Sequence, residues 1–393
     1  MSEWRTVELG DIADFSNGIN FDKSAYTSGV PFIGVSNFGD RFSPPYDELE
    51  QVKTDIVRDS DYLQEGDIVF VRSNGNKELV GRCMLIRNCP RKVTFSGFCI
   101  RCRLRNPSEY DPVFFAYYFK SNLFRRAMSG TAIGANIQNL SQGRLSSHKV
   151  SIPDIASQHY IADILSAYDS LIETNQRQIK LLEDAAQRLY KEWFVDLRFP
   201  GHEDVPVVDG VPEGWKRGTL QDIVVYHDTK RRPLSGQQRE KMKGKYRYYG
   251  AAGILDYVNA YLFDGTYLLF GEDGTVITEA GFPVLQYVSG QFWVNNHAHV
   301  MTGRGDYTTE FLYAKFKQMG ISDVVTGVAQ PKISQGRLSE KATIIPDTKI
   351  VKLFNIRSQS IFKEILLLQD QISYLSEARD RLLPKLMSGE IAV

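Results

Sequence analysis

The sequence predicts an α+β protein built from two related domains, each followed by a long helix. Three observations support this fold class: one sequence pattern occurs twice, a heptad pattern follows each copy, and each copy mixes short strand and helix patterns. We expect two mixed α/β domains separated by two long antiparallel coiled-coil helices, which gives a dumbbell with approximate two-fold symmetry. The expected boundaries are residues 1–152 for the first domain, 153–198 for the first helix, 199–346 for a linker and the second domain, and 347–393 for the last helix.

The repeat is clearest at the two ends of each copy. Ser-Gln-Gly-Arg-Leu-Ser at residues 141–146, followed by Ile-Pro-Asp at 152–154, returns 193 residues later at 334–339 and 345–347. A repeat of this length indicates two domains rather than a solenoid. The middles of the copies differ, so we expect two similar frames that carry different loops. Near the start of each copy, Trp4 with Leu9, Asp11 and Ile12 returns as Trp215 with Leu220, Asp222 and Ile223.

Each copy contains the same kinds of short elements. Residues 65–72 predict a turn that leads into a buried strand, and residues 264–270 predict its counterpart. Short helices rich in aromatic residues are predicted at residues 112–128 and 307–319. The Pro- and Gly-rich stretch 199–214 predicts a linker between the copies.

After each copy, apolar residues recur at alternating steps of four and three residues. This narrow stripe is typical of a coiled coil, and residues 161–193 alone would form a helix roughly 50 Å long. We expect the two helices to pair along this seam, in which Asn175 is placed to fix the register; the alternative is that each helix packs only on its own domain. The predicted seam residues are Ile161, Leu165, Tyr168, Ile172, Ile179, Leu182, Leu189, Ile361, Ile365, Leu368, Ile372, Leu375 and Leu382.

The composition predicts a cytoplasmic protein with two hydrophobic cores of ordinary size. The chain has 393 residues, 42% of them hydrophobic, and no apolar run approaches the ~20 residues that cross a bilayer. Its four cysteines all lie in the first copy, which argues against a disulfide framework shared by the repeat. Basic and acidic residues both number 47, so the net charge does not indicate nucleic-acid binding. Local clusters of Lys and Arg with aromatic residues, densest at residues 230–249, do favour binding to phosphates.

Patterns for catalysis or metal binding lack the sequence context that such sites need. Residues 43–46, Ser-Pro-Pro-Tyr, are similar to a motif with which amino-methyltransferases hold the amine that they methylate, but no Gly-rich cofactor loop accompanies them, which favours a Pro-Pro turn. Cys99 and Cys102 have zinc-knuckle spacing, but the other two cysteines are separated by five residues in a region that alternates like a strand hairpin, which disfavours a compact site and leaves zinc binding as an alternative. His297 and His299 would share one strand face, yet no carboxylate or cysteine near them shows ligand spacing. We therefore predict no catalytic residue and no metal ligand in this chain.

The repeated features follow one another in a distinctive order. Trp-x4-Leu-x-Asp-Ile is followed by a variable domain, Gln-Gly-Arg-Leu-Ser, Ile-Pro and a long helix, and the whole set then occurs again. This order resembles the specificity subunit of type I restriction-modification systems over the whole chain. Residues 181–196 look like the family's central helical region, and residues 381–391 look like its usual C-terminus.

The resemblance implies a prokaryotic DNA-binding protein without catalytic activity. Each variable domain would be a target recognition domain for one half of a split, asymmetric site, and the helices would act as spacer and docking surface. The implied partners are double-stranded DNA, two methyltransferase subunits that modify adenine and, in a restricting complex, two motor-nuclease subunits. S-adenosylmethionine, ATP and Mg would then belong to the partners. The alternatives are a stand-alone adenine methyltransferase that uses Ser43-Pro44-Pro45-Tyr46, and a structural coiled-coil tether that does not bind DNA.

The predicted DNA contacts are polar and basic loop residues, because such side chains reach base edges and phosphates. Arg144 and Arg337 occur in both copies, so we expect them to hold the frame or to contact a phosphate rather than to read a base. For each predicted contact the alternative is an ordinary surface or turn residue. The further predicted contacts are Arg72, Asn74, Asn76, Lys77, Asn136, Gln138 and Asn139 in the first copy, and Arg231, Lys243, Lys245, Arg247, Tyr248, Asn295, Asn296, Gln330 and Lys332 in the second.

Overall fold

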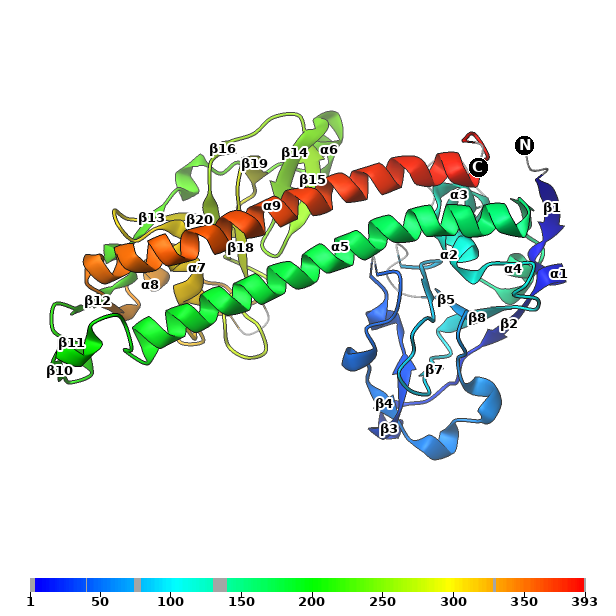
Figure 1. Cartoon of the computed structure of the whole chain (residues 1–393), viewed down its shortest axis with the longest axis horizontal. Coiled ribbons are helices and arrows are strands. Elements are labelled where there is room, and N and C mark those ends of the chain that lie inside the picture. The colour runs from blue at the N-terminus through cyan, green and yellow to red at the C-terminus, as the bar shows by residue number, and fades with distance from the viewer. Residues whose placement is uncertain (1–3, 40, 74–78, 130–139, 328–329, 392–393) are drawn as a thin grey trace. The chain divides into compact units, whose positions relative to one another are not determined.

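The computed structural model describes residues 4–39, 41–73, 79–129, 140–327 and 330–391, and it divides into two compact units. Unit 1 consists of two segments of the chain, one that ends at Thr174 and one that begins at Ile372. Unit 2 is the segment between them, Asn175–Gln371. Each unit therefore combines a globular part with one section of each long helix (Figure 1). The predicted fold class, with two mixed α/β domains and two long helices, is confirmed.

Unit 1 is built on an antiparallel sheet in the order β2-β8-β5-β6. Phe70 on one face of the sheet packs against Phe119 and Phe124 of two helices, while Val69 on the other face packs in a cluster with Phe95 of a smaller sheet, β4-β3-β7. The elements are β1 (Arg5–Glu8), α1 (Leu9–Ile12), β2 (Ala13–Asn17), η1 (Lys23–Ala25), β3 (Tyr26–Ile33), η2 (Val35–Asn37), η3 (Tyr46–Glu48), β4 (Gln51–Val52), η4 (Thr54–Ile56), η5 (Asp59–Asp61), β5 (Ile68–Val71), β6 (Cys83–Leu85), β7 (Thr94–Phe95), β8 (Cys99–Leu104), α2 (Pro112–Lys120), α3 (Asn122–Ser129), α4 (Gln142–Ser146) and β9 (Lys149–Ile152).

Unit 2 repeats this plan with a sheet in the order β13-β20-β17-β18. Phe270 packs on Phe316 of a helix, and Leu269 on the opposite face packs in a cluster with Phe292 of the second sheet, β15-β14-β19-β16. The elements are η7 (His202–Asp204), β10 (Val207–Val208), β11 (Val211–Pro212), β12 (Lys216–Thr219), η8 (Leu220–Asp222), β13 (Val224–Tyr226), η9 (Asp228–Lys230), α6 (Gly236–Lys241), β14 (Lys243–Tyr249), β15 (Ile254–Val258), β16 (Phe263–Asp264), β17 (Tyr267–Gly271), β18 (Leu285–Val288), β19 (Gln291–Val294), β20 (Ala298–Gly303), α7 (Thr309–Lys317), α8 (Gln335–Ser339) and β21 (Ala342–Ile345).

The repeated sequence segments form the same local structures in both units. The Ser-Gln-Gly-Arg-Leu-Ser segments fold into α4 and α8, where the hydroxyls of Ser141 and Ser334 accept hydrogen bonds from the backbone N–H groups of Arg144 and Arg337. Such serine caps satisfy N–H groups that have no partner inside a helix. The strand after each short helix pairs antiparallel with the strand that leads into the repeated Leu-x-Asp-Ile segment, β9 with β1 and β21 with β12. We call these repeated elements, β1, α4 and β9 in unit 1 and β12, α8 and β21 in unit 2, the backbone frame.

The two long helices are α5 (Ile155–Tyr190), which continues as a π-helical turn, η6 (Lys191–Val195), and α9 (Thr348–Met387). Within each unit their sections run antiparallel. In unit 1, Asp169 pairs with Arg379; in unit 2, the Asn175 amide donates to Gln371 Oε1 at 3.1 Å and the Tyr190 ring lies against Phe354. Every seam residue predicted from the sequence is buried or half-buried.

Two local predictions differ from the structure. The aromatic helix expected at residues 112–128 is interrupted at Ser121, whose extended backbone ends α2 before α3 begins. The stretch 199–214 is not a bare linker, because it contains the β10–β11 hairpin, and the buried Phe199 ring packs against Trp215 with centroids 5.2 Å apart. Among the described residues, we find no helix with the length and apolar character needed to span a membrane.

Candidate nucleic-acid interface

In both units a strand of the main sheet ends beside the segment that leads into the repeated short helix. The strand registers place Arg72, just after β5, and Glu272, just after β17, at equivalent positions. The Arg72 carbonyl accepts a hydrogen bond from Leu140 N at 3.0 Å, and the Glu272 carbonyl accepts one from Ile333 N at 2.8 Å. The loop after the strand and the segment before the short helix are therefore fastened together by the same main-chain bond in each unit.

In unit 1 this hydrogen bond joins Arg72, which precedes the predicted DNA contacts at 74–77, to Leu140, which follows those at 136–139. Arg72 is half-buried, and its Nη1 donates weakly to the Gly97 carbonyl at 3.5 Å. The other predicted residues of these loops, Asn74, Asn76, Lys77, Asn136, Gln138 and Asn139, lie outside the described residues, and their contacts stay predictions.

In unit 2 the corresponding loops are described, and they converge. Gly274 N donates to the Pro331 carbonyl at 3.0 Å, and Lys332 exchanges two backbone hydrogen bonds with Thr326. Gln330 and Lys332 are exposed on this surface, as is Asn296 just before β20. Three segments that are far apart in the sequence thus present polar side chains from one region of the unit.

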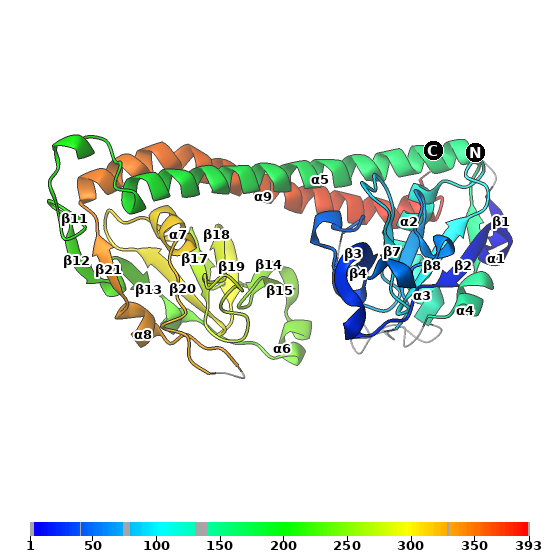
Figure 2. The ribbon, with the colours of Figure 1, turned by 90° about the horizontal axis from the view of Figure 1, so that it is seen from below.

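The repeated arginines lie on α4 and α8, on the side of each unit away from the long helices (Figure 2). Arg337 is exposed and Arg144 is half-buried.

We predict that Arg144→Ala and Arg337→Ala each weaken binding to all DNA sequences. Each change should reduce the slope of log K against log salt concentration by about one, because one phosphate contact is lost. Salt titrations of binding to specific and random duplexes measure this. A loss confined to one base sequence would instead identify the arginine as a base reader.

The basic segment on β14 is less available to DNA than its sequence indicates. Lys243 pairs with Asp256 at 2.8 Å and with Glu240 at 3.1 Å. The hydrogen bond to Asp256 chiefly raises the pKa of Lys243, and the same bond lowers the pKa of Asp256. Lys245 is exposed, with Nζ 5.1 Å from the centroid of its neighbour's ring, and half-buried Arg247 lies 3.8 Å from Asp370 of α9. Of the three cations, Lys245 is thus the most accessible for a phosphate.

Three predicted contacts are occupied inside unit 2, so a direct DNA contact does not fit their positions. Tyr248 is 1% exposed, and its hydroxyl accepts from Leu234 N. Asn295 is 4% exposed, and its Oδ1 accepts from His297 N. The Arg231 side chain, 13% exposed, forms ion pairs with two carboxylates. Strand alternation places side chains of a basic and aromatic segment on opposite faces, which composition alone does not reveal.

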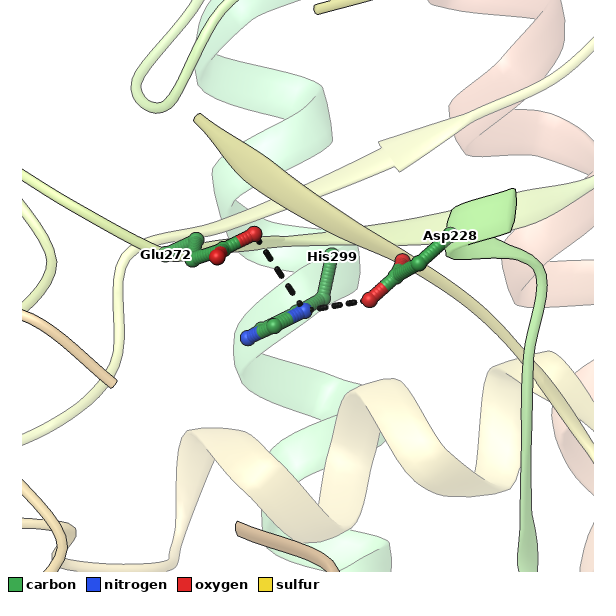
Figure 3. Close-up of side chains that lie close together, drawn as sticks. All are labelled: Asp228, Glu272 and His299. Carbon is green, nitrogen blue, oxygen red and sulfur yellow. Dashed lines mark hydrogen bonds and ion pairs between the residues drawn. The ribbon is translucent and has the colours of Figure 1, made fainter. Parts of the chain in front are cut away.

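Sequence reasoning missed the partners of the two histidines. His297 pairs with Asp273, and His299 lies against Asp228 and Glu272 (Figure 3). The atoms of Asp228, Glu272 and His299 that face one another lie within 4.8 Å, a grouping that can hold a metal ion. Asp228 and His299 are 71 positions apart, so no local spacing could have indicated the cluster.

The cysteines and the Ser-Pro-Pro-Tyr segment serve the packing of unit 1. Cys83 and Cys99 are free and buried, and burial raises the pKa of Cys83 to about 11 and that of Cys99 to about 12. The Ser43 hydroxyl accepts from Arg87 Nε at 3.0 Å, and the Tyr46 hydroxyl donates to the Arg87 carbonyl at 3.1 Å. The motif is thus a turn held against the strand region by Arg87.

Comparison with known proteins agrees with the duplicated architecture. The family model described as the type I restriction modification DNA specificity domain matches residues 1–184 and 212–367. The type I restriction enzyme MjaIX specificity subunit of Methanocaldococcus jannaschii is 26% identical over 303 residues, which are 70% of this chain and 68% of that protein. The HindI specificity subunit of Haemophilus influenzae is 24% identical over 499 residues and is covered, like this chain, in full.

A solved structure shows the same fold. The type I restriction-modification S subunit of M. genitalium matches with a TM-score of 0.54 and 17% identity, over 98% of this chain and 96% of that chain. Because the family model covers most of the sequence, in two copies that coincide with the repeat, this chain belongs to the type I restriction modification DNA specificity family.

Proposed function

We propose that this chain is the DNA-recognition subunit of a type I restriction-modification complex, and that each unit reads one half of a split, asymmetric site. The names of its relatives, which are specificity subunits, support DNA recognition. The observation that carries the split site is the duplicated frame with unlike side chains. The same main-chain bond fastens Arg72 in unit 1 and Glu272 in unit 2, a cation in one and an anion in the other. Equivalent frames that hold unlike loops would present unlike side chains to the two halves of the site.

The long helices support docking of two copies of one partner. The large apolar residues exposed on them include two pairs at equivalent positions of the repeat: Tyr160 with Leu353, 56% and 43% exposed, and Leu181 with Tyr374, 68% and 70% exposed. We call these four residues the outer stripe. The members of each pair are 193 residues apart, and each of the four residues immediately precedes an apolar residue that is buried or half-buried. The recurrence of exposed apolar side chains at equivalent positions of the repeat supports two equivalent interaction sites.

The partners that fit this proposal are methyltransferase subunits, with motor-nuclease subunits in a restricting complex. S-adenosylmethionine, ATP and Mg would then be bound by those subunits. This chain would contribute the choice of DNA sequence and two equivalent seats for the partner.

Mapping of adenine methylation tests the proposal. The chain is co-expressed with a cognate methyltransferase subunit, and the host genome is read by single-molecule sequencing. We expect one split motif with unlike halves and a fixed gap. Cells that express the methyltransferase subunit alone are the control. No methylation beyond that control, or a single short unsplit motif, would contradict recognition by two units.

A further inference from the structure

A buried ionic cluster in unit 2 consists of Asp228, Arg231, Glu272 and His299, which we call the Asp228 cluster. His299 Nδ1 lies 2.6 Å from Asp228 Oδ2 and 3.6 Å from Glu272 Oε2 (Figure 3). Arg231 Nη1 lies 2.5 Å from Glu272 Oε2, and its Nη2 lies 3.4 Å from Asp228 Oδ2. The four side chains are 1–15% exposed, so these charges interact with little screening by water.

The cluster offers the donor set of a metal site, but its cation is Arg231. One imidazole and two carboxylates are ligands typical of zinc and iron, and His299 Nε2 donates to the Ile333 carbonyl at 2.9 Å, as metal-bound histidines often do. However, the guanidinium contacts the same two oxygens, Asp228 Oδ2 and Glu272 Oε2, that face His299. A metal ion at this point would lie beside a fixed positive charge, which disfavours its binding.

Hydrogen-bond bookkeeping shows that the cluster also holds one additional proton. A carbonyl only accepts hydrogen bonds, so His299 Nε2 must carry the proton that points to Ile333. The 2.6 Å contact between Nδ1 and Asp228 Oδ2 then requires a second proton between those atoms. Among the four side chains of the cluster, two carboxylates, one guanidinium and this proton balance in charge without a metal.

The cluster ties together the three segments that converge in unit 2. Asp228 Oδ1 accepts from Val300 N at 2.8 Å, which fixes β20. Glu272 is the first residue after β17, in the loop that contacts the segment before α8. His299 reaches that segment through the Ile333 carbonyl, and Lys332 Nζ lies 3.8 Å from Glu272 Oε1. These are the segments that carry the exposed Asn296, Gln330 and Lys332.

Unit 1 has other residue types at the positions equivalent to the Asp228 cluster. The strand registers match His299 with Ile100 and Glu272 with Arg72, and the sequence offset that relates Ile12 to Ile223 matches Asp228 with Asn17. The buried cluster therefore belongs to the variable part of unit 2 rather than to the frame that both units share.

We propose that the Asp228 cluster is a metal-free positioning device that fixes the DNA-reading segments of unit 2, and thereby the base preference in one half of the site. This inference rests on the proposed function. Its members are positioning residues, since they are buried and act through the exposed residues of the segments that they hold.

The test uses the chain assembled with its methyltransferase subunits and a panel of duplexes that carry single base changes in either half-site. Arg231→Met and His299→Asn should reduce discrimination against wrong bases by about 10- to 100-fold in one half only, the same half for both variants. Discrimination in the other half should stay unchanged. Arg231→Lys, which keeps the charge but not the forked geometry, should restore part of the lost preference.

Asp67→Asn in unit 1 is the matched control, because Asp67 is 1% exposed and pairs with Arg103 at 2.7 Å. It should lower thermal stability without altering preference in the half-site that depends on the Asp228 cluster. If the cluster variants weaken both halves equally, as a merely destabilised protein would, the positioning role is wrong while the proposed function stands. If the unaltered complex shows no preference in one of the halves, the proposed function fails as well.

Elemental analysis of the purified chain tests the metal-free part of the inference. We expect less than stoichiometric zinc, iron or manganese, and no change in half-site discrimination after dialysis against EDTA. One bound metal per chain, or loss of discrimination on chelation, would overturn the assignment of Arg231 as the cation.

Discussion

Replacement of Asp169 by alanine is expected to lower the free energy of unfolding of unit 1 by about 3–5 kcal/mol, the range for breaking a buried ion pair. Asp169 on α5 is 7% exposed, and its two oxygens accept from Arg379 Nη1 of α9 and from the Tyr117 hydroxyl of α2, both at 2.5 Å. Burial, followed by the nearby Asp169 charge, raises the pKa of Tyr117, so the phenol remains a donor. One carboxylate therefore joins three helices, and its loss removes the buried anionic partner of Arg379 and of the Tyr117 hydroxyl.

Urea unfolding measures this effect, with Asp380→Ala as the control. Asp380 pairs with the same arginine at 2.8 Å, but its side chain is 64% exposed, and exposed pairs contribute about 0–1 kcal/mol. If the two variants lost equal stability, the contribution of Asp169 would be no more than that of a surface ion pair.

The second large effect concerns the outer stripe. Tyr160→Glu and Leu353→Glu should each remove one methyltransferase subunit from the complex, and the double variant should remove both, because the two positions are equivalent in the repeat. A charge introduced at the centre of an apolar contact costs on the order of 2 kcal/mol or more, which corresponds to roughly 30-fold in affinity at each seat. Native mass spectrometry of complexes at a fixed subunit concentration counts the bound partners.

Lys363→Glu provides a matched control, since it adds the same side chain at an exposed position of α9 outside the outer stripe. It should leave both partners bound. Retention of both partners by the double variant would place the docking surface elsewhere, and loss of both partners from either single variant would mean that the two seats are not independent.

The fold could be predicted from the sequence where its signals are local or repeated. The seam follows a heptad period, which can be detected in a short stretch of sequence. The short helices of the frame can be predicted because residues 141–146 and 334–339 have the same sequence. The break at Ser121 was missed because apolar residues continue on both sides of it, and the turn is set by backbone conformation rather than by composition. The resemblance to the specificity subunit rests on the order of these local signals, and the family assignment is confirmed.

The candidate site was harder to predict, because its partners meet only in three dimensions. The residues of the Asp228 cluster lie in or next to η9, β17 and β20, which are far apart in the sequence. Each of its charged residues therefore resembles an ordinary surface residue when only its sequence neighbours are considered. Tyr248 and Asn295 were chosen for their residue types, yet both are buried once strands β14 and β19 lie side by side. The residues at 74–77 and 136–139 lie outside the described residues, so their DNA contacts stay predictions.

The hydrogen bonds that join the loops of each unit to its short helix allow sequence specificity to evolve without loss of the fold. Leu140 to Arg72 and Ile333 to Glu272 are bonds between main-chain atoms, which every residue except proline as donor can supply. Mutation of the side chains at these points therefore leaves the fastening itself intact. The two halves of a target can then diverge separately, each by substitutions in its own unit, while selection for folding acts mainly on the repeated ends.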